Sequence, residues 1–353
     1  MIDLSFVPAA LVALLVTAAF MVALQPMARK LGLVDHPGGH KRHTGDVPVI
    51  GGIAMFVGMF AGLSLVGIPT DVLLSVFIAS FLLTITGVLD DRLAAPPLLR
   101  IGLQIAVVLI MVYGAKLSLG EIGDPFGTGP ISMGPVTLVF TVAVTVTMIN
   151  AYNLIDGADG LAGSLALVTL LAIAVVGGLH ELSTAIALTC AAAVFGFLIF
   201  NYPVKMNRPL RAFMGDAGST LLGFTIVWIA LGISQGPDRL ISPVLCLWFA
   251  SIPVYDTLTC FVRRILQGKS PFLPGCDHFH HTLQDGGFGV RQTLGILTGL
   301  QAIYAVIGLM GLYAGIPDVA MFAGWCVLGL TQRLAIERIA ATRRHRKSSA
   351  TSA

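Results

Sequence analysis

The sequence contains few charged residues. Asp, Glu, Lys and Arg make up 11% of its 353 residues, whereas about 25% is usual for a soluble globular domain. Hydrophobic residues make up 56% of the chain, and the mean hydropathy is +0.89. This shortage of charge excludes an ordinary soluble domain. It predicts an all-α, polytopic integral membrane protein whose helices lie in the lipid bilayer.

Cysteine is also scarce, and the five cysteines are scattered along the chain. They are Cys190, Cys246, Cys260, Cys276 and Cys326. No pair has the spacing of a zinc site or of a disulfide framework, so the sequence predicts neither. Most of them lie inside apolar runs, where cysteine behaves as a small hydrophobic side chain. Cys276 differs because it lies in a polar loop.

The first apolar run lacks the marks of a cleaved signal peptide. Residues 4–24 have no basic segment before them and no convincing small-residue cleavage site. The run is also as long as a membrane span. We therefore expect it to be the first transmembrane helix.

Apolar runs of about 17 to 25 residues, long enough to cross a bilayer, indicate about eleven transmembrane helices. The expected spans are 4–25, 49–68, 72–89, 98–115, 134–150, 161–178, 184–201, 218–234, 241–262, 293–313 and 318–337. When the loops between them are assigned alternately to two sides, 19 of the 21 basic residues fall on one side. Because cytoplasmic loops are rich in Lys and Arg, this predicts an external N-terminus and a cytoplasmic C-terminus. The external segment 116–135 is rich in Gly and Pro, and we expect a small hairpin or irregular cap there.

Four polar side chains follow one another at a spacing of three between two apolar runs. They are Asn150, Asn153, Asp156 and Asp159. This spacing places them on roughly one face of a helix or helical turn, and ionisable groups near membrane depth usually mark a site. Carboxylate and amide oxygens suit Mg²⁺. The alternative is a polar loop with turns at Gly157 and Gly160, but such a loop needs fewer polar side chains.

Three further polar motifs lie in loops assigned to the cytoplasmic side. They contain Asp90 and Asp91, then Asp216, then His278, His280 and His281. Four loops with such residues at one membrane face predict an active site built from cytoplasmic loops. Simpler explanations are a solvated helix end for the Asp pair, an N-cap for Asp216, and a surface cluster or zinc site for the histidines. For the histidines we favour phosphate binding, because Lys and Arg are abundant in the same loop.

Together the motifs resemble those of the polyprenyl-phosphate N-acetylhexosamine-1-phosphate transferases. They occur in the family's order over residues 26–290, and the branch that transfers GlcNAc-1-phosphate is the most similar. The matching segments are Lys41-Arg42-His43 with Pro48 and Gly51-Gly52, Leu89-Asp90-Asp91-Arg92, residues 150–161, residues 213–220, Ser242-Pro243, Ser270-Pro271-Phe272 and residues 278–281.

The resemblance implies a role for each motif. The residues implied in catalysis are Asp90, Asp91, Asp156 and Asp159. Asp90 would deprotonate or orient the lipid phosphate with help from Asp91, while the other two would order the metal site and the uridine. The implied metal ligands are Asn153 and Asp216. The residues implied in substrate binding are Asn150, Asn153, Lys41, Arg100, His278, His280 and His281.

The resemblance also implies the reaction. UDP-N-acetylhexosamine, with GlcNAc as the favoured sugar, would react with undecaprenyl phosphate to give undecaprenyl-diphospho-sugar and UMP. Mg²⁺ is the implied cofactor, with Mn²⁺ as the alternative. Residues 1–340 would form one transmembrane catalytic domain and residues 341–353 a basic cytoplasmic tail. The protein would lie in the cell inner (cytoplasmic) membrane and catalyse the first membrane step of a cell-surface polysaccharide pathway.

Several alternatives stay open. Ala94 replaces an Asp that is common in the family. Gly275-Cys276 replaces an acidic–basic pair, and this second change leaves another UDP-amino sugar open. Direct attack and an aspartyl-phosphate intermediate are both compatible with the sequence, as is a homo-oligomer. A transporter with an Asp-lined pathway is less favoured, because it predicts carboxylates near the bilayer midplane and repeated helix interruptions. The CDP-alcohol phosphotransferase signature is missing, and no nucleic-acid partner is expected.

Overall fold

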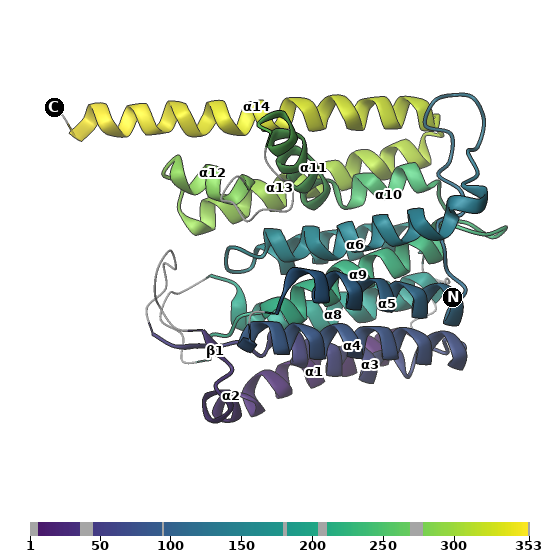
Figure 1. Ribbon diagram of the computed structural model, residues 1–353, viewed down its shortest axis with the longest axis horizontal. Helices are drawn as coiled ribbons and strands as arrows, with labels where there is room; N and C mark the ends of the chain where they lie inside the picture. Colours follow the sequence, from purple (N-terminus) through teal and green to yellow (C-terminus); the bar gives the residue numbers. More distant parts are fainter. Residues whose placement is uncertain are drawn as a thin grey trace.

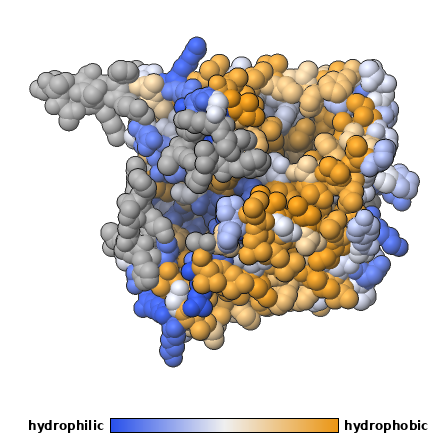
Figure 2. Space-filling view, in the orientation of Figure 1, coloured by the Kyte–Doolittle hydropathy of each residue, from blue (hydrophilic) through white to orange (hydrophobic). Residues whose placement is uncertain are grey.

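The computed structural model describes residues 6–35, 45–93, 95–178, 182–203, 210–268 and 278–351. Within these ranges the protein is almost entirely helical, as expected (Figure 1). Eight of the described helices are long and apolar enough to cross a membrane, and a ninth span results if one bent helix pair is counted. Hydrophobic side chains cover the middle of the face in Figure 2, and hydrophilic side chains lie toward its two ends. The chain is therefore a polytopic all-α membrane protein.

The described helices and strands occur in the following order along the chain. They are α1 (Phe6–Ala23), α2 (Gln25–Leu31), β1 (Val34–Asp35), β2 (Val47–Pro48), α3 (Gly51–Leu63), α4 (Thr70–Leu93), α5 (Pro97–Gly114), the 3₁₀ turn η1 (Gly134–Val136), α6 (Thr137–Ile155), α7 (Leu161–Gly177), α8 (Leu182–Asn201), α9 (Gly215–Ser234), α10 (Pro243–Phe249), α11 (Ser251–Leu266), α12 (Phe279–Asp285), α13 (Val290–Tyr313) and α14 (Asp318–Thr351). Each of the eleven expected spans coincides with one long helix, with one of the shorter apolar helices α3 and α7, or with the pair α10 and α11. The number that cross the membrane and their orientation stay predictions.

The expected single span 241–262 is wrong in one respect, because it is broken. α10 and α11 meet at Ala250 with a bend of 91°. The buried Gln301 of α13 satisfies the broken backbone: its Oε1 accepts a hydrogen bond from Ile252 N at 2.9 Å, and its Nε2 donates to Phe249 O. A side chain that replaces helical hydrogen bonds makes a break tolerable in an apolar surrounding. No local sequence feature indicated this break, because Gln301 lies 49 residues from Ile252.

Among the eight long apolar helices, α9 is the most buried: 89% of the residues in its 18-residue apolar stretch lie inside the protein. Glycines let its neighbours approach closely: a Cβ on Gly87 of α4 would lie 2.2 Å from Ala217 N, and one on Gly52 of α3 would lie 2.3 Å from Gly218 N. Small residues allow such close helix contacts in membranes. The first turn of α9 is therefore enclosed by α3 and α4.

The segment before α9 is held by backbone pairing. Phe213 N donates to Pro48 O at 2.8 Å, and Gly51 N donates to Phe213 O at 2.9 Å. This fixes the chain that leads to Asp216 against the start of α3. At the other end of the molecule, Glu121 and Ser132 form an isolated antiparallel bridge, so the small hairpin expected in segment 116–135 is confirmed.

The expected basic tail does not begin at a helix end. Helix α14 continues through residue 340 to Thr351, so the proposed division into 1–340 and 341–353 stays a prediction. Lys41, Ala94 and Gly275-Cys276 lie outside the described residues.

Candidate active site

Arg100 joins two aspartates that are distant in the sequence. Its Nη1 lies 2.9 Å from Oδ2 of Asp90, at the end of α4, and 4.0 Å from Oδ2 of Asp216, at the start of α9. Arg100 itself is in the first turn of α5. Three helix ends thus bring two carboxylates and one guanidinium together, which confirms that these motifs converge. A fixed guanidinium fork suits both carboxylate and phosphate oxygens.

Asn153 brings α6 to the same place. Its Nδ2 donates to Asp216 Oδ1 at 2.7 Å and to Ser219 Oγ at 3.1 Å. Asn153 and Asp216, the two metal ligands implied by the family resemblance, are therefore in direct contact. Their oxygen atoms, with those of Asp90, form the kind of donor set that a hard divalent cation prefers. The residues present thus fit Mg²⁺.

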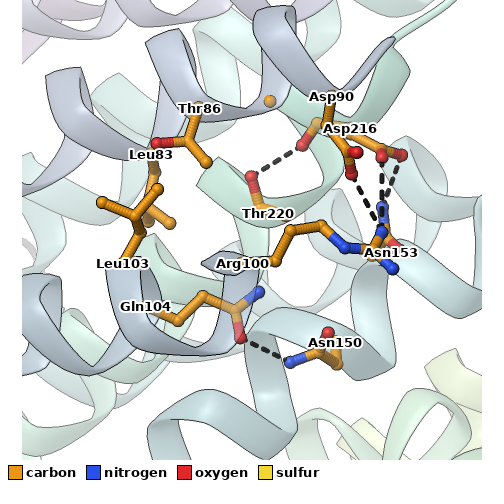
Figure 3. A pocket seen from close by; sticks show the side chains of 11 residues that line it. Leu83, Thr86, Asp90, Arg100, Leu103, Gln104, Asn150, Asn153, Asp216 and Thr220 are labelled. Carbon is orange, nitrogen blue, oxygen red and sulfur yellow. Dashed lines mark hydrogen bonds and ion pairs between the residues drawn. The ribbon is translucent and has the colours of Figure 1, made fainter. Parts of the chain in front are cut away.

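A pocket opens between α4, α5, α6 and α9 (Figure 3). Asp90, Asp216 and Asn153 lie on one side of the view, and Leu83 and Leu103 lie on the other. The full lining is Leu83, Thr86, Gly87, Asp90, Arg100, Leu103, Gln104, Asn150, Asn153, Asp216 and Thr220. A charged end beside an apolar wall suits a ligand that carries both a phosphate and a hydrocarbon chain.

Asn150 lies one helical turn before Asn153 and lines the same pocket. Its Nδ2 donates to Gln104 Oε1 at 2.8 Å. Gln104 is buried in α5, and the sequence interpretation missed it. The signal was present, since a single Gln inside an apolar run must find a polar partner.

Asp91 contacts backbone in this structure. Its Oδ1 accepts a hydrogen bond from Asp216 N at 3.0 Å. Gly215 has φ +69°, and a Cβ there would lie 2.5 Å from Asp91 Oδ2, so only glycine allows this approach without strain. Asp91 therefore fixes the N-terminus of α9, whereas its neighbour Asp90 lines the pocket.

Asp156 and Asp159 lie just beyond α6 and do not line the pocket. Burial, together with the negative charges of Asp216, Asp91 and Asp159, raises the pKa of Asp156 well above its ordinary value. Asp159 is neutralised by Arg211, whose Nη2 lies 2.6 Å from Asp159 Oδ2. Asp91, Asp156 and Asp216 thus form a region of crowded negative charge that a divalent cation would relieve.

Asn201 ties the loop that carries these two aspartates to the segment before α9. Its Oδ1 accepts from Gly160 N at 2.6 Å, and its Nδ2 donates to Ala212 O at 2.9 Å. Both groups of its amide are used inside the protein. The loop therefore has a fixed position relative to Asp216.

The three histidines form one cluster, and two of them are buried. His278 is 3% exposed and His280 is 1% exposed, so a surface cluster does not describe them. The ring centroids of His280 and His281 are 4.1 Å apart. A Cβ on Gly157 would lie 2.1 Å from His280 Nε2, so the cluster packs on the loop between Asp156 and Asp159.

The histidines also differ in protonation. Burial and the neighbouring His281 and His278 lower the pKa of His280 to about 3, which keeps this ring neutral. Burial alone would also lower the pKa of His278, but its hydrogen bonds to Asp256 and Cys260 and the negative charges of those two groups together raise that pKa to about 10. The sequence interpretation did not identify Asp256, because it lies inside an apolar run 22 residues before His278.

Comparisons with known proteins identify the family of this chain. Residues 73–234, which include Asp90, Asn153 and Asp216, match the model of glycosyl transferase family 4. The undecaprenyl-phosphate alpha-N-acetylglucosaminyl 1-phosphate transferase of Escherichia coli (strain K12) is 36% identical over 314 residues, covering 87% of this chain and 84% of that protein. The protein of the same name from Haemophilus influenzae is 36% identical, covering 87% of both chains. The one from Escherichia coli O157:H7 is 35% identical, covering 92% of this chain and 89% of its own. The chain therefore belongs to glycosyl transferase family 4 and is a relative of these glycosyl-1-phosphate transferases.

Proposed function

We propose that the protein transfers N-acetylglucosamine 1-phosphate from UDP-GlcNAc to undecaprenyl phosphate, releasing UMP. The names of its relatives give the acceptor of those proteins, undecaprenyl phosphate, and the group that they transfer, N-acetylglucosaminyl 1-phosphate. The observation that carries the proposal is the contact of Arg100 with Asp90 and Asp216 at the polar end of a pocket with an apolar wall. A lipid phosphate can place its anionic head at that end and its hydrocarbon chain along Leu83 and Leu103.

The acceptor phosphate is oriented by Asp90 and Arg100. Two anionic substrates must meet, and phosphoryl transfer depends on positioning and charge neutralisation more than on covalent chemistry. Arg100 supplies one positive charge, and Asp90 limits the orientations of the acceptor and takes its proton where one is present. Both carboxylate oxygens of Asp90 are already engaged, with Arg100 Nη1 and with Ala95 N. These two contacts hold the Asp90 carboxylate in one orientation, and both direct attack by the lipid phosphate and an aspartyl-phosphate intermediate stay open.

Asn153 and Asp216 are the residues that would hold Mg²⁺, with Mn²⁺ as the alternative ion. When bound, the ion would neutralise diphosphate charge and stabilise the leaving UMP. The loop of Asp156 and Asp159 would position the donor nucleotide beside it. The placement of these residues at helix ends on one side of the bundle is what supports a transferase over a transporter.

The test is a reaction with the purified full-length protein in detergent. It receives undecaprenyl phosphate, Mg²⁺ and one UDP-sugar at a time, with UDP-GlcNAc and other UDP-amino sugars compared at equal concentration. We expect UMP and a lipid-linked diphosphate sugar, with the highest rate for UDP-GlcNAc. A higher rate with another UDP-amino sugar would show that this sugar, and not GlcNAc, is the one transferred. No UMP release with any of the UDP-sugars would refute the proposed reaction.

The proposed location is the cell inner membrane, with the active site at the cytoplasmic face. UDP-sugars are made in the cytoplasm, and the basic residues are concentrated on the side of the site. The test places single cysteines, Asp71→Cys or Arg92→Cys, at opposite ends of α4 in a cysteine-free background. Intact cells that carry each variant are treated with a membrane-impermeant maleimide. We expect labelling at position 71 alone, and labelling at position 92 alone would reverse the orientation.

A further inference from the structure

Asp256 is a fully buried carboxylate that the proposed transfer does not use directly. It lies in α11, just after the break in the span, and is 0% exposed. Its Oδ2 lies 2.8 Å from His278 Nδ1, and its Oδ1 accepts a hydrogen bond from Phe279 N at 2.7 Å. One carboxylate therefore holds both the ring of His278 and the backbone at the start of α12. An ionised group buried this deeply is costly unless it is paired, and here both of its oxygens are paired.

The ring held by Asp256 is part of a chain of contacts that reaches the active site. His278 and His280 are stacked nearly parallel, with centroids 6.0 Å apart and an interplanar angle of 9°. Neither ring nitrogen of His280 has a hydrogen-bond partner among the described residues. His280 is nevertheless fixed in place, because it lies against Gly157. Movement of His278 would therefore move His280 relative to the loop of Asp156 and Asp159.

We propose that Asp256 is a positioning residue of the transferase: it fixes His278 and the start of α12, and so holds His280 against Gly157 in the loop that carries Asp156 and Asp159. This inference rests on the proposed transfer reaction and adds a residue to it. Asp256 is placed to do this by the 91° break between α10 and α11, which redirects α11. If α10 and α11 formed one straight helix, the Asp256 carboxylate would lie in a different position relative to His278.

A metal site is the competing explanation for the same residues. Ligand atoms of Asp256, Cys260 and His278 all lie within 4.8 Å of one another, and Cys260 Sγ is 3.6 Å from His278 Nδ1. A structural zinc site almost always has four protein ligands, whereas this group has three among the described residues. Both oxygens of Asp256 already accept hydrogen bonds from His278 and Phe279. The hydrogen-bonded arrangement accounts for all of these contacts, so we favour it.

The test is a double-mutant cycle on the purified full-length protein. Asp256→Asn keeps the shape of the side chain and an oxygen for Phe279 N, but it removes the charge that holds His278. We expect kcat to fall about 100-fold, which is the rate loss that a small misplacement of the reacting groups causes. The KM for undecaprenyl phosphate should change less than about threefold. Because Asp256 acts through His278, Asp256→Asn should cause no further loss in a His278→Gln background.

Two controls accompany the cycle. Asp318→Asn removes a carboxylate at the other end of the bundle, where it accepts from Ser242 Oγ at 2.5 Å, and should leave kcat unchanged. Cys260→Ala removes the thiol beside His278 and should also leave kcat near that of the wild type. Losing one partner of a buried pair is more destabilising than losing both. The single variant Asp256→Asn is therefore more prone to misfold than the double variant Asp256→Asn/His278→Gln. If the single variant does not fold, the kcat of the double variant is compared with that of His278→Gln alone.

The outcomes separate this inference from the proposed function. Wild-type protein that releases no UMP overturns the proposed function itself. Active wild type with an equally active Asp256→Asn variant, or losses that multiply in the double variant, overturns the positioning role alone. Stoichiometric zinc in the purified protein, lost together with activity in Cys260→Ala, overturns it in favour of the metal site. Equal activity of the double variant and His278→Gln, with no bound zinc, is the expected result.

Discussion

The guanidinium of Arg100 lies 2.9 Å from the carboxylate of Asp90. The two residues are ten positions apart, on helices α4 and α5 that run in opposite directions around a short turn. Ala95 N in that turn donates to the other oxygen of Asp90 at 2.7 Å. The turn therefore holds the acceptor side of the pocket in a fixed geometry before any substrate is present, which is the preorganisation that phosphoryl transfer requires.

Replacement of either central aspartate should abolish transfer. Asp90→Asn and Asp216→Asn each keep the side-chain shape but remove a charge at the reacting centre, and we expect kcat to fall by at least about 100-fold. UMP release by the purified variants measures this. Asp71→Asn, an exposed aspartate at the opposite end of α4, is the matched control and should keep wild-type activity. Normal UMP release from either central variant would remove that residue from the mechanism.

Asn153 should determine how much Mg²⁺ the enzyme needs. Asn153→Ala removes the amide oxygen that would bind Mg²⁺, together with the Nδ2 that donates to Asp216 Oδ1, so the Mg²⁺ concentration for half-maximal activity should rise about 10-fold. Asn150→Ala, one helical turn away and bonded to Gln104, should leave this concentration unchanged. The measurement is UMP release during a Mg²⁺ titration after removal of metal with EDTA. An identical shift in both variants, or full activity in EDTA, would contradict a metal site at Asn153 and Asp216.

Asp156 should make the protein less stable as the pH rises. Burial and the nearby carboxylates raise its pKa in the folded state above the unfolded value of 3.8. Between these two pKa values the folded state binds more protons than the unfolded state, so stability falls as pH increases through that window. Asp156→Asn cannot ionise, and it should therefore raise the Tm at neutral pH and have little effect well below pH 3.8, where both states of the wild type are protonated.

The Tm of the wild type and of Asp156→Asn, measured in detergent across this pH range, checks that prediction. Mg²⁺ should shrink the difference at neutral pH, because a bound cation relieves the same repulsion. Asp238→Asn, an exposed aspartate between α9 and α10, serves as the control. A lower Tm for Asp156→Asn at neutral pH would show that the carboxylate is stabilising there.

Gln301 should be needed for the break between α10 and α11. Gln301→Leu has a similar volume but leaves Ile252 N without its acceptor, which costs about 1–3 kcal/mol. We expect a lower Tm and, because α11 carries Asp256, a lower kcat. Thr331→Val, which removes an exposed hydroxyl bonded within α14, should change neither. An unchanged Tm for Gln301→Leu would mean that other groups or water support the break.

The sequence predicted those site residues that lie at the ends of apolar runs. Asp90, Asn153 and Asp216 each adjoin an apolar run, and counting runs places them on one side of the membrane. The structure confirms that they meet. Gln104, Asp256 and Gln301 could not be found in this way, because each is a single polar residue inside an apolar run whose partner lies 22 to 49 residues away.

The sequence by itself determined that this chain is a helical membrane protein with its aspartate motifs at one end, because hydropathy and loop charge act through local chemistry. Only the tertiary structure decided which polar groups pair, that Asp91 holds backbone while Asp90 lines the pocket, and that one span breaks at Ala250. The physical reason is that a buried polar group must find a partner, and which partner it finds depends on how the helices pack.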